Sequence, residues 1–278
     1  MSEPVLYVIA TPIGNLNDLS PRAIKVLGSV DLIAAEDTRH TGRLLAQFSI
    51  KAPMISVHEH NETQRTELIL HKLAEGQSVA LVSDAGTPLI SDPGYPLVRA
   101  VRAAGFKVSP IPGCCAFVAA LSVSGLPSDR FMFCGFLPSK ASARERILQE
   151  WVGFTATLIF YESTHRILDS LASMLKVFGP EREAVVAREL TKTFETIRGG
   201  CLQDLLTWMQ ADPNQQKGEF VVLIQGAPST EVEQLVDEHS LKILQRLAQE
   251  LPPKKAAAIT AEITGVNKKL LYESLLQK

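Results

Sequence analysis

One stretch of the chain holds acidic residues in an arrangement that could bind a ligand. LVSDAGTPLISDPG, residues 81–94, runs from an apolar segment into a loop with two aspartates and no lysine or arginine. Asp84 and Asp92 would repel a phosphate and favour a cationic or hydroxyl-rich group. A sulfonium compound with an amino group and a ribose fits that description.

A second stretch, AEDTRHT at residues 35–41, is dense in charge directly after an apolar run. Glu36, Asp37 and His40 are residue types that act as a general base or hold a hydroxyl, and Arg39 is a residue type that contacts phosphate. Capping of the following helix by Asp37 or Thr38 is the alternative explanation.

Other common chemistries lack their signatures. The chain has neither GxxxxGK[ST] nor GxGxxG, so a phosphate-binding loop is not expected. His58 and His60 flank Glu59, but no third and fourth metal ligand is apparent, and we expect no metal. The four cysteines have no CxxC spacing, which favours reduced, buried thiols over a zinc site or a disulfide framework.

The acidic and charged stretches must be positioned by the elements around them. Short apolar segments alternate with helical patterns in the first half of the chain, which predicts an α/β domain with a mainly parallel sheet. The expected strands cover residues 5–10, 31–35, 54–57, 79–82 and 107–111. One helix is expected to begin after Ser20, and three further helices are expected at residues 41–48, 62–75 and 94–104. Ligands bind beyond the carboxyl ends of such strands. The loops TPIGN, AEDTRHTG, SDAGTP and PGCCA all follow these ends, so we expect a pocket there.

The second half of the chain has a different pattern. FMFCGF, TATLIFYES, EAVVARELT, ETIRGG and EFVVLIQG are candidate strands, and helices are expected at about 141–152, 165–178 and 201–211. This predicts a mixed α/β domain, followed by a linker and a helical tail. The expected domains are therefore residues 1–118, residues 119–228 and a small helical C-terminal extension at residues 232–278.

Composition limits the possible partners. The 28 basic and 30 acidic residues give a net charge of 28 − 30 = −2, so any nucleic-acid binding must use local basic patches. FLPSKASARERI, with Lys140, Arg144 and Arg146, is one such patch, or else only an exposed helix start. The sequence has no basic leader and no apolar run of membrane length, so we expect a cytoplasmic protein without a membrane partner.

The C-terminal tail is also basic. From Lys254 to Lys278 there are five lysines and two glutamates. Pro252 and Pro253 precede a predicted helix that Gly265 ends, and a second helix follows, as in a helix-turn-helix. This favours nucleic-acid binding, and a dimerisation element is the alternative.

Several of these motifs together resemble a known family. TPIGNLND, AAEDTRHT, LVSDAGTPLISDPG, IFYESTHR, ARELTKTFE and KGEFV occur in this order, and they resemble the bacterial small-subunit ribosomal RNA ribose 2′-O-methyltransferase I family of the tetrapyrrole methylase superfamily. The resemblance implies a two-domain α/β protein that binds S-adenosylmethionine between its domains, usually as a homodimer. It further implies methyl transfer to the ribose 2′ oxygen of a cytidine in the decoding region of 16S rRNA, with free rRNA or the small ribosomal subunit as partner.

The resemblance also implies residues that bind the cofactor. The loop SDAGTP would place Asp84, Ala85 and Thr87 near the methionine part, and PGCCA would place Cys115 and Ala116 beside the ligand. Many relatives have serine or threonine near Cys115, so main-chain contacts are expected there. Tyr161 and Gly218 would enclose the adenosine, while a core position is the alternative for Tyr161.

For the transfer step we expect Glu36 or Asp37 as base or ribose anchor, Arg39 as phosphate contact and Lys192 as a further catalytic residue. The residues expected to bind the substrate are Thr11, Asn15, His40, Arg144, Lys254, Lys255, Lys268 and Lys269. The alternatives are a tetrapyrrole methylase of the precorrin type and a non-catalytic RNA-binding assembly module.

Overall fold

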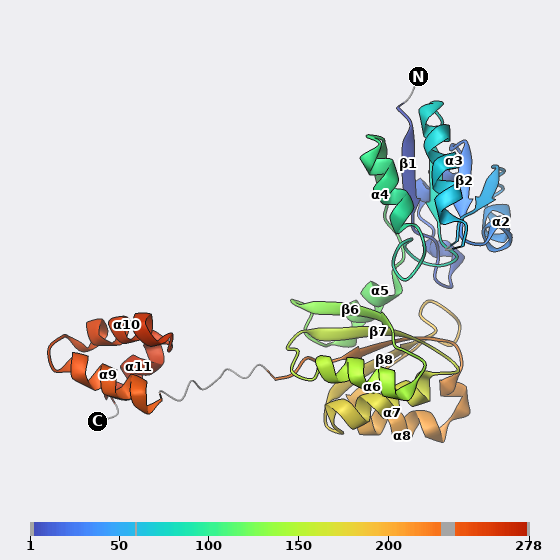
Figure 1. Ribbon diagram of the computed structural model, residues 1–278. Helices are drawn as coiled ribbons and strands as arrows, with labels where there is room; N and C mark the ends of the chain where they lie inside the picture. Colours follow the sequence, from blue (N-terminus) through green and yellow to red (C-terminus); the bar gives the residue numbers. More distant parts are fainter. Residues whose placement is uncertain (1–2, 59, 229–236, 277–278) are drawn as a thin grey trace. The chain divides into compact units, whose positions relative to one another are not determined.

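The computed structural model describes residues 3–58, 60–228 and 237–276. The chain divides into two compact units, Met1–Gly226 and Ala227–Lys278 (Figure 1). The first unit holds two β-sheets and the second holds three of the described helices. Each unit has a hydrophobic core of its own.

The first sheet has the strand order β3-β2-β4-β1-β5, and all of its strand pairs are parallel. Its strands are β1 (Val5–Ile9), β2 (Leu32–Ala35), β3 (Met54–Ser56), β4 (Val79–Val82) and β5 (Lys107–Ile111). Every residue of β2 and β4 is buried, which explains why these strands are continuously apolar.

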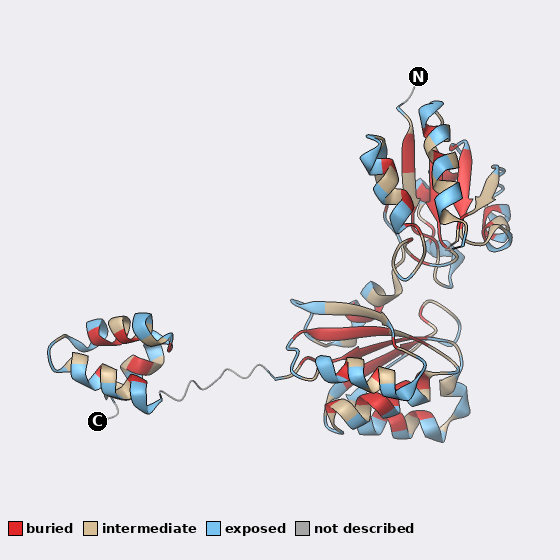
Figure 2. Ribbon diagram, in the orientation of Figure 1, coloured by how far each residue is buried: buried red, intermediate tan, exposed pale blue. Residues whose placement is uncertain are grey.

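Helices cover both faces of this sheet. They are α1 (Pro21–Leu27), α2 (Thr38–Gln47), α3 (Glu62–Ala74) and α4 (Tyr95–Ala103). Leu27 of α1 and Leu45 of α2 pack into the core on one face, whereas Leu73 of α3 and Val101 of α4 pack into the core on the other. Figure 2 shows the buried strands between helices whose outer faces are exposed. Because the strands are parallel, their carboxyl ends share one edge, and the loops that follow them meet there.

The second sheet has the order β6-β7-β10-β8-β9, with β6 parallel to β7 and all other pairs antiparallel. Its strands are β6 (Phe131–Phe136), β7 (Thr157–Ser163), β8 (Glu183–Arg188), β9 (Thr196–Cys201) and β10 (Glu219–Ile224). The core on one face includes residues of α6 (Ala141–Glu150), α7 (Ile167–Phe178) and α8 (Leu202–Ala211). The opposite core includes Ala120 and Leu121 of α5 (Ala116–Ser124).

The second unit consists, in its described part, of α9 (Glu238–Ala248), α10 (Pro253–Thr264) and α11 (Lys268–Leu276). Leu244, Ala256, Ala257, Val266 and Leu271 form its buried core. Gly265 ends α10 with a φ of 74°, a left-handed conformation that glycine adopts without a steric penalty.

The predicted architecture is confirmed: a parallel first sheet, a mixed second sheet and a helical C-terminal region. Several strand and helix bounds differ from the prediction by one to three residues. Helix α2 begins at Thr38 rather than Thr41 because Asp37 caps it, and α5 was not predicted at all. In the described ranges, every helix is too short or too polar to cross a membrane.

Candidate functional site

The loops after β1 and β4 are held together by an isolated β-bridge. The amide of Thr11 donates to the carbonyl of Gly86 at 2.8 Å, and the amide of Gly86 donates to the carbonyl of Thr11 at 3.1 Å. The buried hydroxyl of Thr11 donates to the carbonyl of Ser83 at 3.2 Å. Gly86 has a φ of 82°, so a residue with a side chain would be strained there. Thr11 thus shapes the loop that contains Asp84 and is not free to contact a ligand with its hydroxyl.

The loops after β2 and β4 are joined by reciprocal hydrogen bonds. The amide of Asp84 donates to Oε2 of Glu36 at 3.2 Å, and the amide of Asp37 donates to Oδ1 of Asp84 at 3.1 Å. Each carboxylate therefore satisfies a main-chain group of the opposite loop. This pairing fixes Asp84 at the edge of the first sheet.

Asp37 also caps α2, which confirms the alternative explanation given above for the charged stretch at residues 35–41. Its carboxylate accepts hydrogen bonds from the amide and the guanidinium of Arg39, at 2.8 Å and 2.6 Å. The guanidinium bond is the largest cause that holds the pKa of Asp37 well below its usual range. A carboxylate that protonates so reluctantly is a poor general base. The side chain of Arg39 is 86% exposed.

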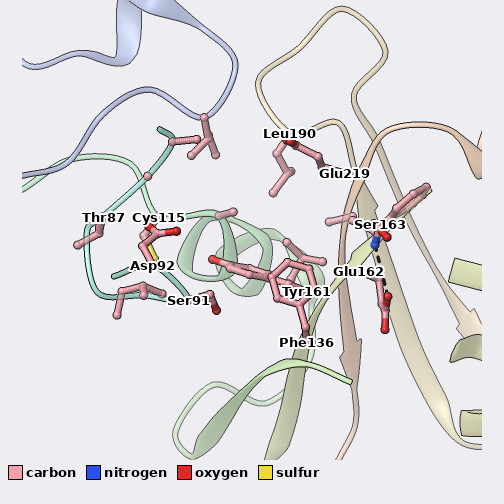
Figure 3. Close-up of a pocket in the computed structure, with 18 residues that line it drawn as sticks. Thr87, Ser91, Asp92, Cys115, Phe136, Tyr161, Glu162, Ser163, Leu190 and Glu219 are labelled. Atoms are coloured by element: carbon pink, nitrogen blue, oxygen red, sulfur yellow. Dashed lines mark hydrogen bonds between the residues drawn. The ribbon is translucent and has the colours of Figure 1, made fainter. Parts of the chain in front are cut away.

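A cavity of about 330 Å³ lies between the loops of the first sheet and the strands of the second (Figure 3). Ala85, Thr87, Cys115, Ala116 and Tyr161, all expected to bind the cofactor, line it. The phenolic oxygen of Tyr161 accepts a hydrogen bond from the amide of Phe117 at 3.2 Å. We call it the first cavity; its volume is within the usual range for small-molecule sites.

Asp92, which the sequence indicates beside Asp84 as favouring a cationic group, lies in the wall of the first cavity. Its Oδ2 atom is buried and accepts no hydrogen bond from any described residue. Burial, followed by the negative charge of Glu36, raises the pKa of Asp92 to about 6. An unpaired acceptor of this kind suits a cationic ligand group, which would restore the charged carboxylate. In Figure 3, Asp92 is on the loop side of the cavity, and Tyr161 and Phe136 are on the β-sheet side.

A second cavity, of about 400 Å³, shares Ile13, Ala85 and Glu219 with the first. Asp84, expected to bind the cofactor, lines this second cavity and is absent from the wall of the first. The remaining residues of the wall are Pro12, Gly14, Leu16, His40, Arg43, Leu44, Gln47 and Lys192. Neither cavity is lined by Glu36, Asp37 or Arg39, so the structure does not place the expected base or the expected phosphate contact in a cavity wall.

Lys192 is bound by two carboxylates. Its ammonium lies 2.9 Å from Oε1 of Glu189 and 2.8 Å from Oε2 of Glu219. Burial lowers the pKa of Lys192, but the hydrogen bonds to Glu219 and Glu189 outweigh this effect and raise the pKa above its ordinary value. Lys192 is therefore a fixed cation at neutral pH and not a base.

Gly218 lies directly before β10 and is absent from the walls of both cavities. Its φ is 109°, and a Cβ at this position would lie 2.5 Å from the side chain of Glu189. Its amide and carbonyl both bond the hydroxyl of Thr164, at 2.8 Å and 2.9 Å. Gly218 thus leaves room for the carboxylate that holds Lys192.

Backbone strain is concentrated around the two cavities. Of the five non-glycine residues with positive φ in the described chain, Leu89 and Ser91 precede Asp92, and Glu189 and Thr191 precede Lys192. Each such conformation costs on the order of 1–3 kcal/mol, and such residues are frequent at functional sites.

The structure does not support the phosphate contact expected for Arg144. The side chain is buried, with 3% of the residue exposed, and its guanidinium donates to Ser173 Oγ and to the carbonyls of Pro138, Ser139 and Asp169. These bonds fasten α6 to α7 and leave no free donor edge. Arg144 therefore has a structural role.

The other predicted substrate residues are at the surface. Asn15 is exposed and accepts a hydrogen bond from the amide of Asn17. His40 is exposed on α2. In the second unit, Lys254 and Lys255 are exposed on α10, and Lys268 and Lys269 are exposed on α11. Within the residues that are described, no cluster of histidine, cysteine, aspartate and glutamate could hold a metal ion; Glu59 lies outside them.

Comparison with known proteins identifies the family of the chain. Residues 5–206 match the family model of Tetrapyrrole (Corrin/Porphyrin) Methylases, and residues 233–278 match that of the RsmI C-terminal HTH domain. The chain is 56% identical over 278 residues to "Ribosomal RNA small subunit methyltransferase I" of Pseudomonas aeruginosa, covering 100% of this chain and 99% of that protein. The protein of the same name from Escherichia coli O157:H7 is 54% identical, with 100% and 96% covered.

Solved structures show the same fold at low identity. A cobalt precorrin-4 methyltransferase matches with a TM-score of 0.59 and 16% identity, over 80% of this chain and 94% of that one. The methyltransferase CobJ matches with a TM-score of 0.59 and 22% identity, over 81% and 95%.

Proposed function

Because the chain belongs to the ribosomal RNA small subunit methyltransferase I family of the tetrapyrrole methylases, we propose that it methylates 16S rRNA with S-adenosylmethionine. The acceptor in this proposal is the ribose 2′-hydroxyl of a cytidine in the decoding region. The single observation that carries it is the pair of adjoining cavities, one lined by an unpaired carboxylate and one by basic side chains.

The first cavity fits the methyl donor. When bound, S-adenosylmethionine supplies a methyl group activated by a positively charged sulfur. Asp92 offers a buried oxygen without a partner among the described residues, which suits the cationic end of the donor. Tyr161 and Phe136, whose ring centroids lie 5.7 Å apart, offer aromatic surface for a flat base.

The shared wall between the cavities suits the acceptor oxygen. Asp84 and Glu219 both line the second cavity, and either carboxylate can accept a proton from a sugar hydroxyl. Lys192 adds a permanent cation beside Glu219. Glu36 and Asp37 act in this proposal as positioning residues, because they hold Asp84 rather than line the cavity. Holding the reactants in line is the main contribution that these residues make to the rate.

The second unit would deliver RNA to the catalytic unit. It offers four exposed lysines, Lys254, Lys255, Lys268 and Lys269, on two adjacent helices. Such lysines bind the phosphate backbone without reading its sequence. The partner is either free 16S rRNA or the assembled small subunit.

We also propose that the protein works in the cytoplasm as a homodimer. The support for a dimer is an apolar surface of the first unit, with Val118 51%, Val123 53% and Phe131 46% exposed. Val118 and Val123 belong to α5, and Phe117 of the same helix lies 6.1 Å from Phe131 of β6 between ring centroids. Light scattering of the purified chain should give twice the chain mass; a monomer at micromolar concentration would exclude this part of the proposal.

Transfer of a labelled methyl group tests the activity. Tritiated S-adenosylmethionine is incubated with the protein and with free 16S rRNA, intact small subunits or a porphyrin precursor. We expect label in RNA and none in the porphyrin. Label in the porphyrin alone would support the tetrapyrrole methylase instead, and a chain that does not bind the donor in calorimetry would be a non-catalytic RNA-binding module.

A further inference from the structure

One face of α2 points into the second cavity. His40, Arg43, Leu44 and Gln47 follow one another at helical spacing of three, one and three residues, and all four line the cavity. Residues at this spacing share a face of a helix. Arg39 is outside this set and is bound to Asp37 instead.

Arg43 differs from the other cations near the cavities. Its side chain is exposed and forms no hydrogen bond or ion pair with any residue in the described ranges. Lys192, by contrast, is held by Glu189 and Glu219, and Arg39 by Asp37. Arg43 therefore keeps its full set of hydrogen-bond donors for a ligand. His40 also lines the cavity, and its imidazole has no side-chain partner among the described residues.

The other walls of the second cavity have a different chemistry. Leu16, which is 45% exposed, and Pro12 present apolar surface. Ile13, Ala85 and Glu219 form the boundary with the first cavity. One cavity thus combines a cationic face, an apolar face and a carboxylate wall next to the donor site.

We propose that the second cavity binds the acceptor nucleotide of single-stranded RNA, with its phosphate on Arg43 and His40. Arginine matches a phosphate with two parallel hydrogen bonds. The base contacts Leu16 and Pro12, and the sugar faces the wall shared with the first cavity. RNA loops allow this because their bases can turn away from the stack. The inference rests on the proposed function and adds the nucleotide site to it.

The carboxylates in the cavity do not oppose this arrangement. Glu219 is ion-paired at 2.8 Å with Lys192, a cation that it shares with Glu189, and Oδ1 of Asp84 accepts a hydrogen bond from the amide of Asp37 at 3.1 Å. Glu219 belongs to the wall assigned to the sugar, and Asp84 directly precedes Ala85 of that wall. The hydroxyl groups of a sugar donate hydrogen bonds to carboxylates. The unpaired positive charge is on α2, where the phosphate is placed.

The test compares Arg43→Ala and Arg43→Lys with Arg102→Ala. Arg102 is an exposed arginine of α4 outside both cavities, so it controls for the loss of one positive charge. Affinity for a fluorescent 16S rRNA fragment is measured by anisotropy at several salt concentrations, and S-adenosylmethionine binding is measured by calorimetry. Circular dichroism melting checks the fold of each variant.

We expect Arg43→Ala to weaken RNA binding roughly 10- to 100-fold, the effect of losing a charged hydrogen bond. The salt dependence should become less steep by about 0.7, as for one lost phosphate contact on a single strand. Arg43→Lys should recover part of the RNA affinity, and Arg102→Ala should bind RNA as the wild type does. The affinity for S-adenosylmethionine should be unchanged in all three variants.

Two results would overturn the inference. In one, Arg43→Ala binds RNA as tightly as Arg102→Ala does. In the other, Arg43→Ala loses affinity for S-adenosylmethionine in the same proportion, which would assign the second cavity to the donor. Since binding is measured without turnover, failure of the wild-type protein to methylate RNA would contradict the proposed function separately.

Discussion

The amide nitrogen of Asp84 lies 3.2 Å from Oε2 of Glu36, and so two loops 48 residues apart in sequence are joined at the edge of the first sheet. Asp37, the next residue after Glu36, returns a bond from its own amide to the carboxylate of Asp84. Glu36 also contributes to the raised pKa of Asp92 in the first cavity. One carboxylate outside both cavities thereby influences a residue in each.

Replacement of Glu36 by alanine should reduce the methyl-transfer rate about tenfold or more. The variant leaves the amide of Asp84 without its acceptor, which costs about 1–3 kcal/mol if water does not replace it. Glu36→Gln retains an acceptor oxygen and should recover most of the rate. A purely structural role would not change the pH profile of donor binding, whereas Glu36→Ala should shift that profile to lower pH because Asp92 loses a neighbouring negative charge.

Asp92→Asn should stabilise the free protein at neutral pH. Because the folded-state pKa of Asp92 is raised from 3.8 to about 6, its stabilising contribution is complete below pH 3.8 and is lost as the pH rises through about 6. The neutral asparagine avoids that loss. Discounted for partial exposure, we expect a gain of about 1–2 kcal/mol at pH 7.5 and little change at pH 4. Urea denaturation at the two pH values measures the difference.

The same substitution should weaken binding of S-adenosylmethionine above pH 6. In the wild type, donor affinity should rise with pH as Asp92 becomes charged, and this dependence should be absent in Asp92→Asn. Calorimetry between pH 5 and pH 8 provides the profile. Equal pH profiles for the two proteins would exclude Asp92 as the cation-binding group.

Gly218→Ala should lower both stability and activity. Alanine at a φ of 109° is strained, and its Cβ would displace the carboxylate of Glu189 that holds Lys192. Gly76 is the matched control, because its φ is 84° and a Cβ added there would meet no other atom within 4 Å. Urea denaturation should show a loss of roughly 1 kcal/mol for Gly76→Ala and a larger loss for Gly218→Ala. Equal losses would mean that the contact with Glu189 is unimportant.

The double variant Lys254→Ala/Lys255→Ala should weaken RNA binding without changing donor binding. Each lost phosphate contact reduces the salt dependence of affinity, by about 0.7 for single strands. Lys25→Ala/Lys51→Ala removes two exposed lysines of the first unit and serves as the control. If both pairs changed RNA affinity equally, the effect would reflect net charge, and the second unit would not be the RNA contact.

The alternation of strands and helices was readable from the sequence because buried parallel strands are continuously apolar, as in β2 and β4. The sequence does not predict helix α5, because AFVAALSVS is mostly apolar and its apolar residues have no helical period. Its one signal was Gly125, which ends the helix with a φ of 74°.

The side chains of the site were only partly predictable. The loop motifs indicate five residues of the first cavity and also the preference of Asp92 for a cation, but the burial and the unpaired oxygen of Asp92 depend on how the loop folds back and cannot be read from the sequence. Arg43 and Gln47 became visible only when α2 was seen to face the second cavity. The phosphate contact predicted for Arg144 is wrong. Leu148, four residues further along the same face of α6, is buried as Arg144 is.

The most direct test is to find where the methyl group goes. Small subunits labelled with tritiated S-adenosylmethionine are taken apart, and the 16S rRNA is hydrolysed with alkali, which cannot cleave next to a methylated 2′ oxygen. We predict that the label is recovered in an alkali-resistant dinucleotide that begins with cytidine. Label released in ordinary mononucleotides, or found on a base, would contradict ribose methylation by this protein.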